Sequence, residues 1–262
     1  MIERSNFHTH TTFCDGKSTA EEIVKVAIAR GLTALGFSGH AYTPFDAGFC
    51  MTKAGTVAYR EEILRLKEAY KDQISIFCGL EMDYFSEEDT KDFDFVIGSV
   101  HYVEKNGQYF SVDESKEAFL QHVKTGWNGD VYAFAEDYFS LVSQVVEKTH
   151  ADIIGHFDLI TKFNEGEVLF CENNPRYEAA WDSALKALVK TNKLFEINTG
   201  AVQRGYRSVP YPSAAILKKI KAYGGEVLIT SDCHIANAVD FGFEQAMRLA
   251  AYCGFNQGND SI

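Results

Sequence analysis

The chain has 262 residues, of which 46% are apolar and 24% are charged, and it contains only four prolines. This composition excludes a disordered chain, a collagen-like repeat and a small disulfide-stapled fold, because enough apolar residues are present to bury a full core. The 37 acidic and 25 basic residues give a formal net charge of −12, which opposes binding to nucleic acid or to an anionic membrane surface. Small charged metabolites therefore remain as candidate ligands.

The cysteines and the N-terminal residues indicate the cellular compartment. The six cysteines are scattered without a CxxC pair, and the first six residues, Met-Ile-Glu-Arg-Ser-Asn, lack the basic-then-apolar order of a signal segment. No apolar run approaches the roughly 18 residues that span a bilayer. We expect a cytoplasmic protein with reduced thiols and without a membrane partner. The sequence makes no prediction about the oligomeric state.

Short apolar runs of strand length alternate with longer helical patterns along the whole chain, without a Gly-, Ser- or Pro-rich linker. This alternation predicts repeated strand and helix units in one domain. The segment Ser18-Thr19-Ala20-Glu21 has the pattern of a capping box, and Asn174-Pro175 and Pro212-Ser213 are later helix-start signals. The predicted strands are, in chain order, 6–10, 34–40, 74–81, 93–101, 152–156, 194–199 and 227–234.

The connections between these strands determine the predicted fold class. Nearly every connection is long enough to hold a crossover helix, which indicates parallel strands. Continuous apolar runs at 95–97 and 227–229 suit strands that are buried on both faces, as in a barrel. We predict an α/β fold with a distorted seven-stranded (β/α)7 TIM-like barrel, in which residues 1–262 form a single domain. An open doubly wound sheet is the alternative.

Six of the predicted strands end in residue types that bind metal ions. The carboxyl ends of parallel strands meet at one rim, where barrel enzymes place their chemistry, so these side chains should converge there. The period of two in a strand puts His8 and His10 on one face, about 7 Å apart along the chain, and it does the same for Asp232 and His234. Asp15 follows the first strand in a tight turn. The nine candidate ligands are His8, His10, Asp15, His40, Glu81, His101, His156, Asp232 and His234.

Nine ligands are too many for one ion. A tetrahedral ion uses three or four protein ligands, so the set suits two or three ions that share bridging carboxylates. Mixed imidazole and carboxylate ligands suit zinc, manganese or iron and do not distinguish among them. Cys14 and Cys233 should point to the opposite face if the strand alternation holds. His122 and His150 are expected on or at the end of helices, without a ligand role.

A basic cluster follows the sixth predicted strand. The segment Gln203-Arg204-Gly205-Tyr206-Arg207 should lie in a loop over the same rim, and guanidinium groups match phosphate oxygens. We predict that Arg204 and Arg207 bind phosphate, with an ordinary solvated loop as the alternative. Asn198, at the end of that strand, is predicted either to orient a ligand or to cap the turn.

Seven short motifs carry a resemblance that covers nearly the whole chain. They are His8-Thr9-His10 with Asp15-Gly16, Ser38-Gly39-His40, Gly79-Leu80-Glu81, Gly98-Ser99-Val100-His101, Gly155-His156-Phe157-Asp158, Glu196-Ile197-Asn198-Thr199-Gly200, and Ser231-Asp232-Cys233-His234. With these motifs the chain resembles the polymerase and histidinol phosphatase (PHP) superfamily, and within it the monofunctional histidinol-phosphate phosphatases. The resemblance implies a PHP-type metallophosphatase domain with three divalent metal ions at the carboxyl rim of the barrel.

The resemblance also implies how the ligands divide among the three ions. The first ion would be held by His8, His10, Glu81 and Asp232, the second by Asp15, His40 and His234, and the third by Glu81, His101 and His156, with Glu81 bridging. Some relatives have histidine where this chain has Asp15, so the metal preference stays open. Arg204 and Arg207 would be the phosphate-holding arginines.

The activity implied by the resemblance is the hydrolysis of L-histidinol phosphate to L-histidinol and phosphate, a step of histidine biosynthesis. Two ions about 3.5–4 Å apart can lower the pKa of a bridging water, so that a metal-bridged hydroxide acts as the nucleophile. The third ion and the arginines would neutralise charge on the phosphoryl oxygens. Asp232 or His234 is the expected proton donor to the leaving alkoxide. Asp113 and Asp158 are candidates for the acidic contact that the substrate's ammonium and imidazole require.

Three other interpretations remain open. Amidohydrolase barrels also begin with a His-x-His strand, but they typically have a modified lysine at the end of the fourth strand, where this chain has His101. A second interpretation is a nuclease or phosphodiesterase of the same superfamily, or a PHP-family phosphoesterase that acts on another small phosphorylated metabolite or on a nucleotide. The third is a metal-binding module without catalytic activity. Hydrolysis of p-nitrophenyl phosphate against its bis-ester, with and without metal, separates them.

Overall fold

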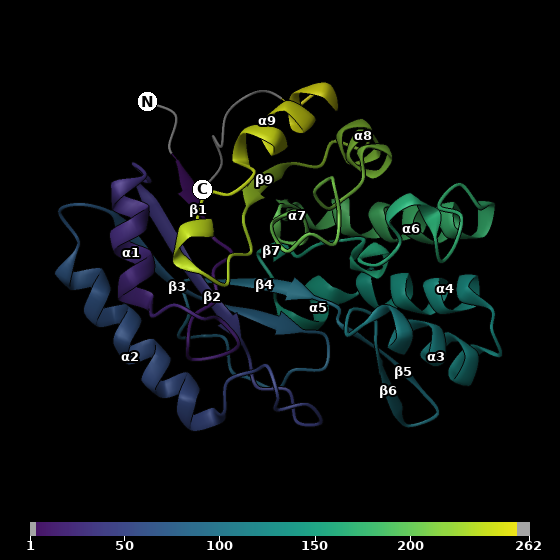
Figure 1. Ribbon diagram of the computed structural model, residues 1–262, viewed down its shortest axis with the longest axis horizontal. Helices are drawn as coiled ribbons and strands as arrows, with labels where there is room; N and C mark the ends of the chain where they lie inside the picture. Colours follow the sequence, from purple (N-terminus) through teal and green to yellow (C-terminus); the bar gives the residue numbers. More distant parts are fainter. Residues whose placement is uncertain (1–3, 256–262) are drawn as a thin grey trace.

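Seven parallel strands form the central sheet of the computed structural model, which describes residues 4–255 (Figure 1). Their spatial order, β1-β2-β3-β4-β7-β8-β9, follows the order of the chain, as in a barrel. The strands are β1 (Ser5–Asn6), β2 (Ala34–His40), β3 (Ser75–Asp83), β4 (Phe95–Ser99), β7 (Ile153–Ile154), β8 (Leu194–Asn198) and β9 (Val227–Thr230). Each overlaps a predicted strand, although β1 shares only Asn6 with the predicted 6–10, so the seven-stranded α/β prediction is confirmed.

The sheet closes on itself just beyond the ends of its first and last strands. Thr9 forms a parallel bridge with Cys233, and the backbone N–H of His10 donates to the carbonyl of Cys233 at 2.9 Å. The sheet is therefore a nearly closed barrel, and the open-sheet alternative is wrong. β9 ends before the predicted 227–234 because Asp232 adopts a left-handed conformation with φ of +47°, which a strand cannot contain.

The helices surround the barrel (Figure 1). Figure 1 shows α1 and α2 together on one side of the barrel and α3, α4 and α6 together on the other. The α-helices are α1 (Ala20–Ala29), α2 (Lys53–Ala69), α3 (Lys116–Trp127), α4 (Val131–Val142), α5 (Val145–Thr149), α6 (Pro175–Leu188), α7 (Gly200–Gln203), α8 (Ala214–Ala222) and α9 (Phe243–Tyr252). Short 3₁₀ turns are η1 (Leu159–Thr161), η2 (Glu165–Glu167), η3 (Val189–Thr191) and η4 (Ala236–Ala238).

The predicted helix starts are correct to within one residue. The capping box of α1 is made by Thr19 and Glu22, not by Ser18 and Glu21, since the Thr19 hydroxyl accepts from the Glu22 backbone and the Glu22 carboxylate accepts from the Thr19 backbone. Asn174 caps α6. Ser213 precedes α8 but makes no side-chain cap hydrogen bond.

The interior of the barrel has an apolar floor below a polar rim. Its floor is an apolar cluster from strands around the ring, namely Phe7, Ala34, Phe95, Ile97, Ile153 and Leu228. A Cβ atom at Gly79 would collide with the Phe95 ring, so glycine is required there. Because inward side chains recur every second residue, β3 passes from Gly79 at the floor to Glu81 and Asp83 at the rim. The floor thus places carboxylates where the barrel opens.

An antiparallel hairpin, β5 (Tyr102–Lys105) and β6 (Gln108–Ser111), follows β4 and was not predicted. Its turn residues Asn106 and Gly107 both have positive φ, at 54° and 78°, as a type I′ turn requires. The Asn-Gly pair is a strong hairpin signal that the sequence analysis did not use. The expectation of crossover helices in the connections is therefore incomplete for the segment between β4 and β7.

Among the helices in the described part of the chain, none combines the length and apolar character needed to cross a bilayer.

Candidate metal centre

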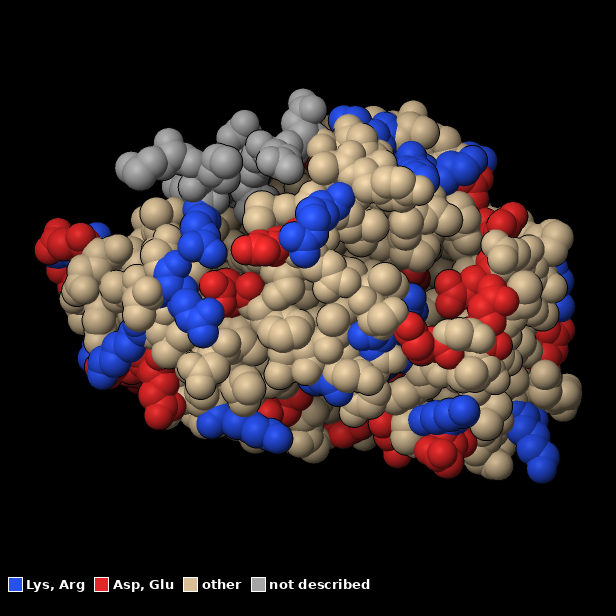
Figure 2. Space-filling view, turned by 45° about the horizontal axis from the view of Figure 1, so that its top comes forward, with Lys and Arg blue, Asp and Glu red and all other residues tan. Residues whose placement is uncertain are grey.

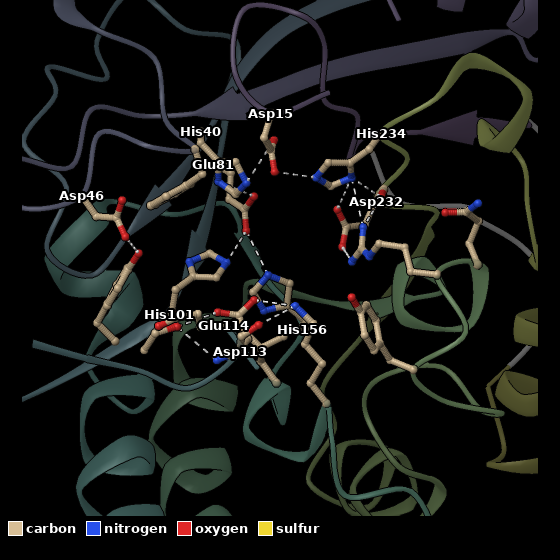
Figure 3. A pocket seen from close by; sticks show the side chains of 18 of the residues that line it. Asp15, His40, Asp46, Glu81, His101, Asp113, Glu114, His156, Asp232 and His234 are labelled. Atoms are coloured by element: carbon tan, nitrogen blue, oxygen red, sulfur yellow. Dashed lines mark hydrogen bonds and ion pairs between the residues drawn. The ribbon is translucent and has the colours of Figure 1, made fainter. Parts of the chain in front are cut away.

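A cavity of about 840 Å³ opens at the carboxyl ends of the barrel strands (Figure 3). Seven of the nine predicted ligands line it, and the other two, His8 and His10, are fully buried beside it. Figure 3 shows imidazoles and carboxylates from separate strands and loops directed toward a common centre. The structure therefore brings together side chains that are more than 220 residues apart in the sequence, as the strand-end pattern predicts.

Glu81 lies at the centre of this arrangement. Its carboxylate is 1% exposed, and five imidazole nitrogens surround its two oxygens. Around Oε2 these are His8 Nε2 at 3.1 Å, His10 Nε2 at 3.3 Å and His40 Nδ1 at 3.1 Å. Around Oε1 they are His156 Nε2 at 2.9 Å and His101 Nε2 at 3.5 Å. One carboxylate thus reaches two different sets of histidines, which is the geometry of a bridging ligand.

Asp232 and Asp15 complete the polar rim. Asp232 Oδ1 lies 3.3 Å from His10 Nε2 and 3.6 Å from His234 Nδ1. Asp15 Oδ2 lies 3.1 Å from His234 Nε2, and its Oδ1 lies 3.8 Å from His40 Nε2. Asp232 has the left-handed backbone noted above, and such strained conformations concentrate at functional sites. The strain is consistent with a side chain that must point into the cavity.

The ligand atoms fall into three overlapping groups within 4.8 Å of one another. These groups are His10 with Asp15, His40 and His234; His8 with His10 and Asp232; and His40 with Glu81 and His101. The first two correspond to the predicted second and first ion sites, with His10 shared. The third contains His40 where the prediction has His156, although His156 contacts Glu81 at 2.9 Å. Candidate metal-ligating side chains are therefore clustered, while the number of ions stays a prediction.

The donor set fits divalent metal ions. The Nε2 atom of His10 is buried without a hydrogen-bond partner and faces the carboxylates of Glu81 and Asp232 at 3.3 Å each. A buried nitrogen between two carboxylates is costly unless a cation or a proton lies there. Imidazole nitrogens and carboxylate oxygens are the ligands that zinc, manganese and iron share.

The electrostatics favour cations in this cluster. Burial disfavours ionisation of Asp232, but Arg204 and His8 outweigh it and keep the pKa of that carboxyl well below its usual range. Burial also opposes protonation of His8, yet the carboxylates of Glu196, Glu81 and Asp232 raise its pKa to about 10. Asp232 therefore stays ionised at neutral pH, and a metal ion would displace the proton that His8 otherwise holds.

Two buried carboxylates behind the ligands were missed by the sequence analysis. Glu196 Oε2 lies 2.8 Å from His8 Nδ1, and Asp83 Oδ2 lies 3.3 Å from His101 Nδ1 and accepts from the His101 backbone at 2.7 Å. The period of two could have found both, because Asp83 follows Glu81 and Glu196 precedes Asn198 by two residues in their strands. Such carboxylates fix the orientation of ligand histidines.

The two predicted phosphate-binding arginines lie in different environments. Arg204 lines the cavity and donates to Asp232 Oδ2 at 2.9 Å. Arg207 does not line it. Its guanidinium donates to the Thr161 carbonyl at 3.0 Å and lies over the Tyr211 ring, 5.3 Å from the ring centroid. The structure thus brings only Arg204 to the cavity, because the loop turns at Gly205 with a φ of +76° between them.

Asn198 is fully buried and caps the turn, the second of its two predicted roles. Its Oδ1 accepts from the Gly200 backbone at 2.9 Å, and its Nδ2 donates to Glu196. The expectation for Cys14 is wrong, since its Sγ lies 3.6 Å from His10 Nδ1. The turn after the first strand breaks the period of two on which that expectation rested. Cys233 is buried in the apolar cluster on the outer side of the barrel.

Four further residues can now be placed. Asp113 lines the cavity, whereas Asp158 does not: it is fully buried and accepts from the Ser213 backbone. His122 lies in α3 and unexpectedly reaches the outer edge of the cavity. His150 is the exposed C-terminal cap of α5, as expected of a residue without a ligand role.

The fold and the site together define an α/β barrel protein with a pocket of clustered candidate metal ligands at its carboxyl rim. Residues 6–200 match the model of the PHP domain, and the chain therefore belongs to the PHP domain family. This match includes all the predicted ligands except Asp232 and His234, which lie beyond it. Those two residues join the cluster through the strand that closes the barrel.

Comparison with known proteins supports the same fold. Histidinol-phosphatase of Bacillus subtilis is 25% identical over 269 residues, covering 93% of this chain and 98% of that protein. A solved protein from Listeria monocytogenes has a TM-score of 0.78 and 20% identity, over 92% of this chain and 99% of that one. Histidinol phosphate phosphatase of Lactococcus lactis, solved with zinc, L-histidinol and phosphate, has a TM-score of 0.72 and 24% identity, over 98% and 95% of the two chains.

Proposed function

We propose that this chain is a metal-dependent phosphomonoesterase that hydrolyses L-histidinol phosphate to L-histidinol and phosphate. The observation that carries the proposal is the gathering of imidazoles and carboxylates, beside the guanidinium of Arg204, at one cavity. Family membership supports the class of activity. The names of the B. subtilis and L. lactis relatives support the substrate. We extend the proposal to residues 1–262 as one domain with a cytoplasmic location.

The metal centre that we infer holds three divalent ions, of zinc, manganese or iron. The first would be held by His8, His10, Glu81 and Asp232, the second by Asp15, His40 and His234, and the third by Glu81, His101 and His156. The two-sided environment of Glu81 supports its bridging role. Zinc in the L. lactis relative supports zinc as one candidate. When bound, such ions supply an activated water and positive charge for the phosphoryl oxygens.

The side chains of the cavity are placed to orient the phosphoryl group. Arg204 is held by Asp232 at 2.9 Å, so its remaining N–H groups are positioned to donate to phosphoryl oxygens. Asp232 is a poor acid because its pKa lies well below the usual range. His234 is a proposed ligand of the second ion, and its Nδ1 lies 3.0 Å from a donor nitrogen of Arg204, so neither of the two predicted proton donors is free for that role. Arg207 supports the phosphate site indirectly, since it holds Thr161 beside Lys162, which lines the cavity.

The outer part of the cavity suits the organic half of histidinol phosphate. Three carboxylates line it, those of Asp46, Asp113 and Glu114. Its aromatic lining includes Phe45, Phe49, Tyr102 and Tyr109. Carboxylates and aromatic faces recognise an ammonium and a planar imidazole. Asp113 pairs with Lys162 at 2.9 Å, whereas Glu114 is exposed and is the better candidate for the ammonium.

A small metabolite fits the molecule better than a nucleic acid. On the face shown in Figure 2, basic and acidic side chains are interspersed over the described surface. The formal net charge of −12 also opposes the binding of a nucleic acid, because its phosphates are negatively charged.

The deciding experiment is phosphate release by the metal-free protein before and after zinc or manganese is restored. We expect metal-dependent hydrolysis of histidinol phosphate and of p-nitrophenyl phosphate, with little hydrolysis of bis-(p-nitrophenyl) phosphate. A panel of other phosphorylated metabolites serves as the control for substrate choice. Preference for another metabolite would replace the substrate, and inactivity towards all phosphomonoesters with metal bound would contradict the proposal.

A further inference from the structure

A buried glutamate outside the cavity has hydrogen bonds on both carboxylate oxygens. Glu196 lies in β8 and is 0% exposed. Its Oε2 lies 2.8 Å from His8 Nδ1 and accepts from the Thr230 hydroxyl at 2.7 Å. Its Oε1 accepts from the Asn198 side-chain amide at 2.9 Å and from the backbone N–H of His156. This single side chain therefore contacts a proposed ligand of the first ion and the backbone of a proposed ligand of the third.

The two groups at Oε1 cannot reverse their roles. The His156 backbone is a donor by its chemistry. The Asn198 amide is fixed because its Oδ1 accepts from the Gly200 backbone N–H at 2.9 Å, which directs its NH₂ group at Glu196. An acceptor is consequently required at the Oε1 position. At the Oε2 position the Thr230 hydroxyl can rotate and accept instead of donating, so an acceptor is required there only if His8 carries its proton on Nδ1.

We propose that Glu196 is a positioning residue that accepts the Nδ1–H of His8 and so leaves the Nε2 lone pair of His8 free for a metal ion. Nε2 faces Glu81 Oε2 at 3.1 Å and Asp232 Oδ1 at 3.7 Å, where the first ion would lie. The tautomer of a ligand histidine is set by the hydrogen bond of its other nitrogen. This inference rests on the proposed metal centre and not on the proposed substrate.

The substitution Glu196→Gln tests the tautomer at almost constant side-chain volume. Its amide oxygen must occupy the Oε1 position, where two N–H groups donate, so its NH₂ group is directed at His8 Nδ1. His8 then accepts on Nδ1 and carries its proton on Nε2, the atom that should bind the ion. We expect the variant to stay folded and to lose about one zinc equivalent, or to bind it about 10 to 100 times more weakly.

Zinc binding is measured by titrating metal-free protein in competition with a chromophoric chelator. The matched control is Thr230→Val, which removes the other donor to Oε2 but keeps the carboxylate, and its zinc affinity should stay within about threefold of the parent. Ring ¹⁵N spectra of the zinc-loaded parent should show His8 protonated on Nδ1 and bound through Nε2. This measurement does not depend on whether a variant folds.

Two results would overturn the inference: parental zinc affinity and stoichiometry in Glu196→Gln, or zinc bound to Nδ1 of His8 in the parent spectra. A parent protein that binds no zinc, manganese or iron would instead contradict the metal centre of the proposed function. Failure of histidinol phosphate as a substrate would leave the inference intact, because zinc binding is measured without substrate.

Discussion

The inner and outer parts of the cavity are built in different ways. The inner part consists of strand-end residues such as Glu81, which is 1% exposed and surrounded by imidazoles. The outer part comes from the connections, namely the β5–β6 hairpin and the segment between β2 and α2. There Phe45 and Tyr109 are 37% and 43% exposed, and their rings stack 3.7 Å apart. One part is held by the barrel and the other by a contact between two loops.

Because of this difference, we expect the inner part to determine the reaction and the outer part to determine the choice of substrate. Strand ends in a barrel hold reacting groups in place, and connections vary without disturbing them. Substitutions in the inner part should therefore reduce the hydrolysis of every phosphomonoester. Substitutions in the outer part should instead change the discrimination between histidinol phosphate and a generic substrate such as p-nitrophenyl phosphate.

The largest effect is expected at Glu81. Replacing Glu81 with glutamine removes the charge that faces five imidazole nitrogens, so we expect the loss of more than one metal equivalent and a fall in kcat of about 10³-fold or more for both substrates. Elemental analysis and steady-state kinetics check the two effects. Glu178→Gln, at an exposed position on α6, is the control and should leave both unchanged. Full metal content in Glu81→Gln would contradict the bridging role.

The sequence predicts the inner part well and the outer part poorly, for physical reasons. His8, His40 and His101 could be found because each follows an apolar strand, and parallel strands must end at one rim. Glu196 could have been found by the same period of two. The position of Arg207 could not, since the path of its loop depends on contacts with Thr161 and Tyr211 that no local pattern encodes.

The next largest effect is expected from substitutions in the loop that contains Arg204 and Arg207. They test whether this loop belongs to the inner part of the cavity. Arg204→Ala removes charge-assisted hydrogen bonds worth roughly 1.5–3 kcal/mol, a factor of about 10 to 150 in kcat/KM for both substrates, without a change in metal content. Arg204→Lys should recover only part of the loss. Arg207→Ala should mainly lower the Tm, because its guanidinium packs against Thr161 and Tyr211. An Arg204→Ala enzyme within twofold of the parent would place the phosphate elsewhere.

A smaller and more selective effect is expected at Glu114 in the outer part. Glu114→Gln removes one exposed carboxylate from the cavity wall, so KM for histidinol phosphate should rise about three- to tenfold, while p-nitrophenyl phosphate hydrolysis stays constant. Glu117→Gln on the neighbouring first turn of α3 is the matched control. Equal changes for both substrates would show that the outer wall does not recognise the leaving group.

The smallest effect concerns the ion pair of the outer part, between Asp113 and Lys162. Burial alone would raise the pKa of Asp113, but Lys162 and, more weakly, His101 lower it to about 2. Because the folded-state pKa lies below the ordinary value of 3.8, the pair stabilises the fold above that pH, and the contribution is lost as the pH falls toward 2. Lys162→Met removes the main opposing charge, so burial should then raise the pKa of Asp113 and acid unfolding should begin at a higher pH. Circular dichroism between pH 7 and pH 2 measures the shift.

The control is Lys91→Met, which breaks the exposed pair with Asp89. It should leave the unfolding midpoint within about 0.2 pH units of the parent. A Lys162→Met midpoint equal to the parent's would mean that the outer wall is stabilised by its aromatic contacts and not by this ion pair.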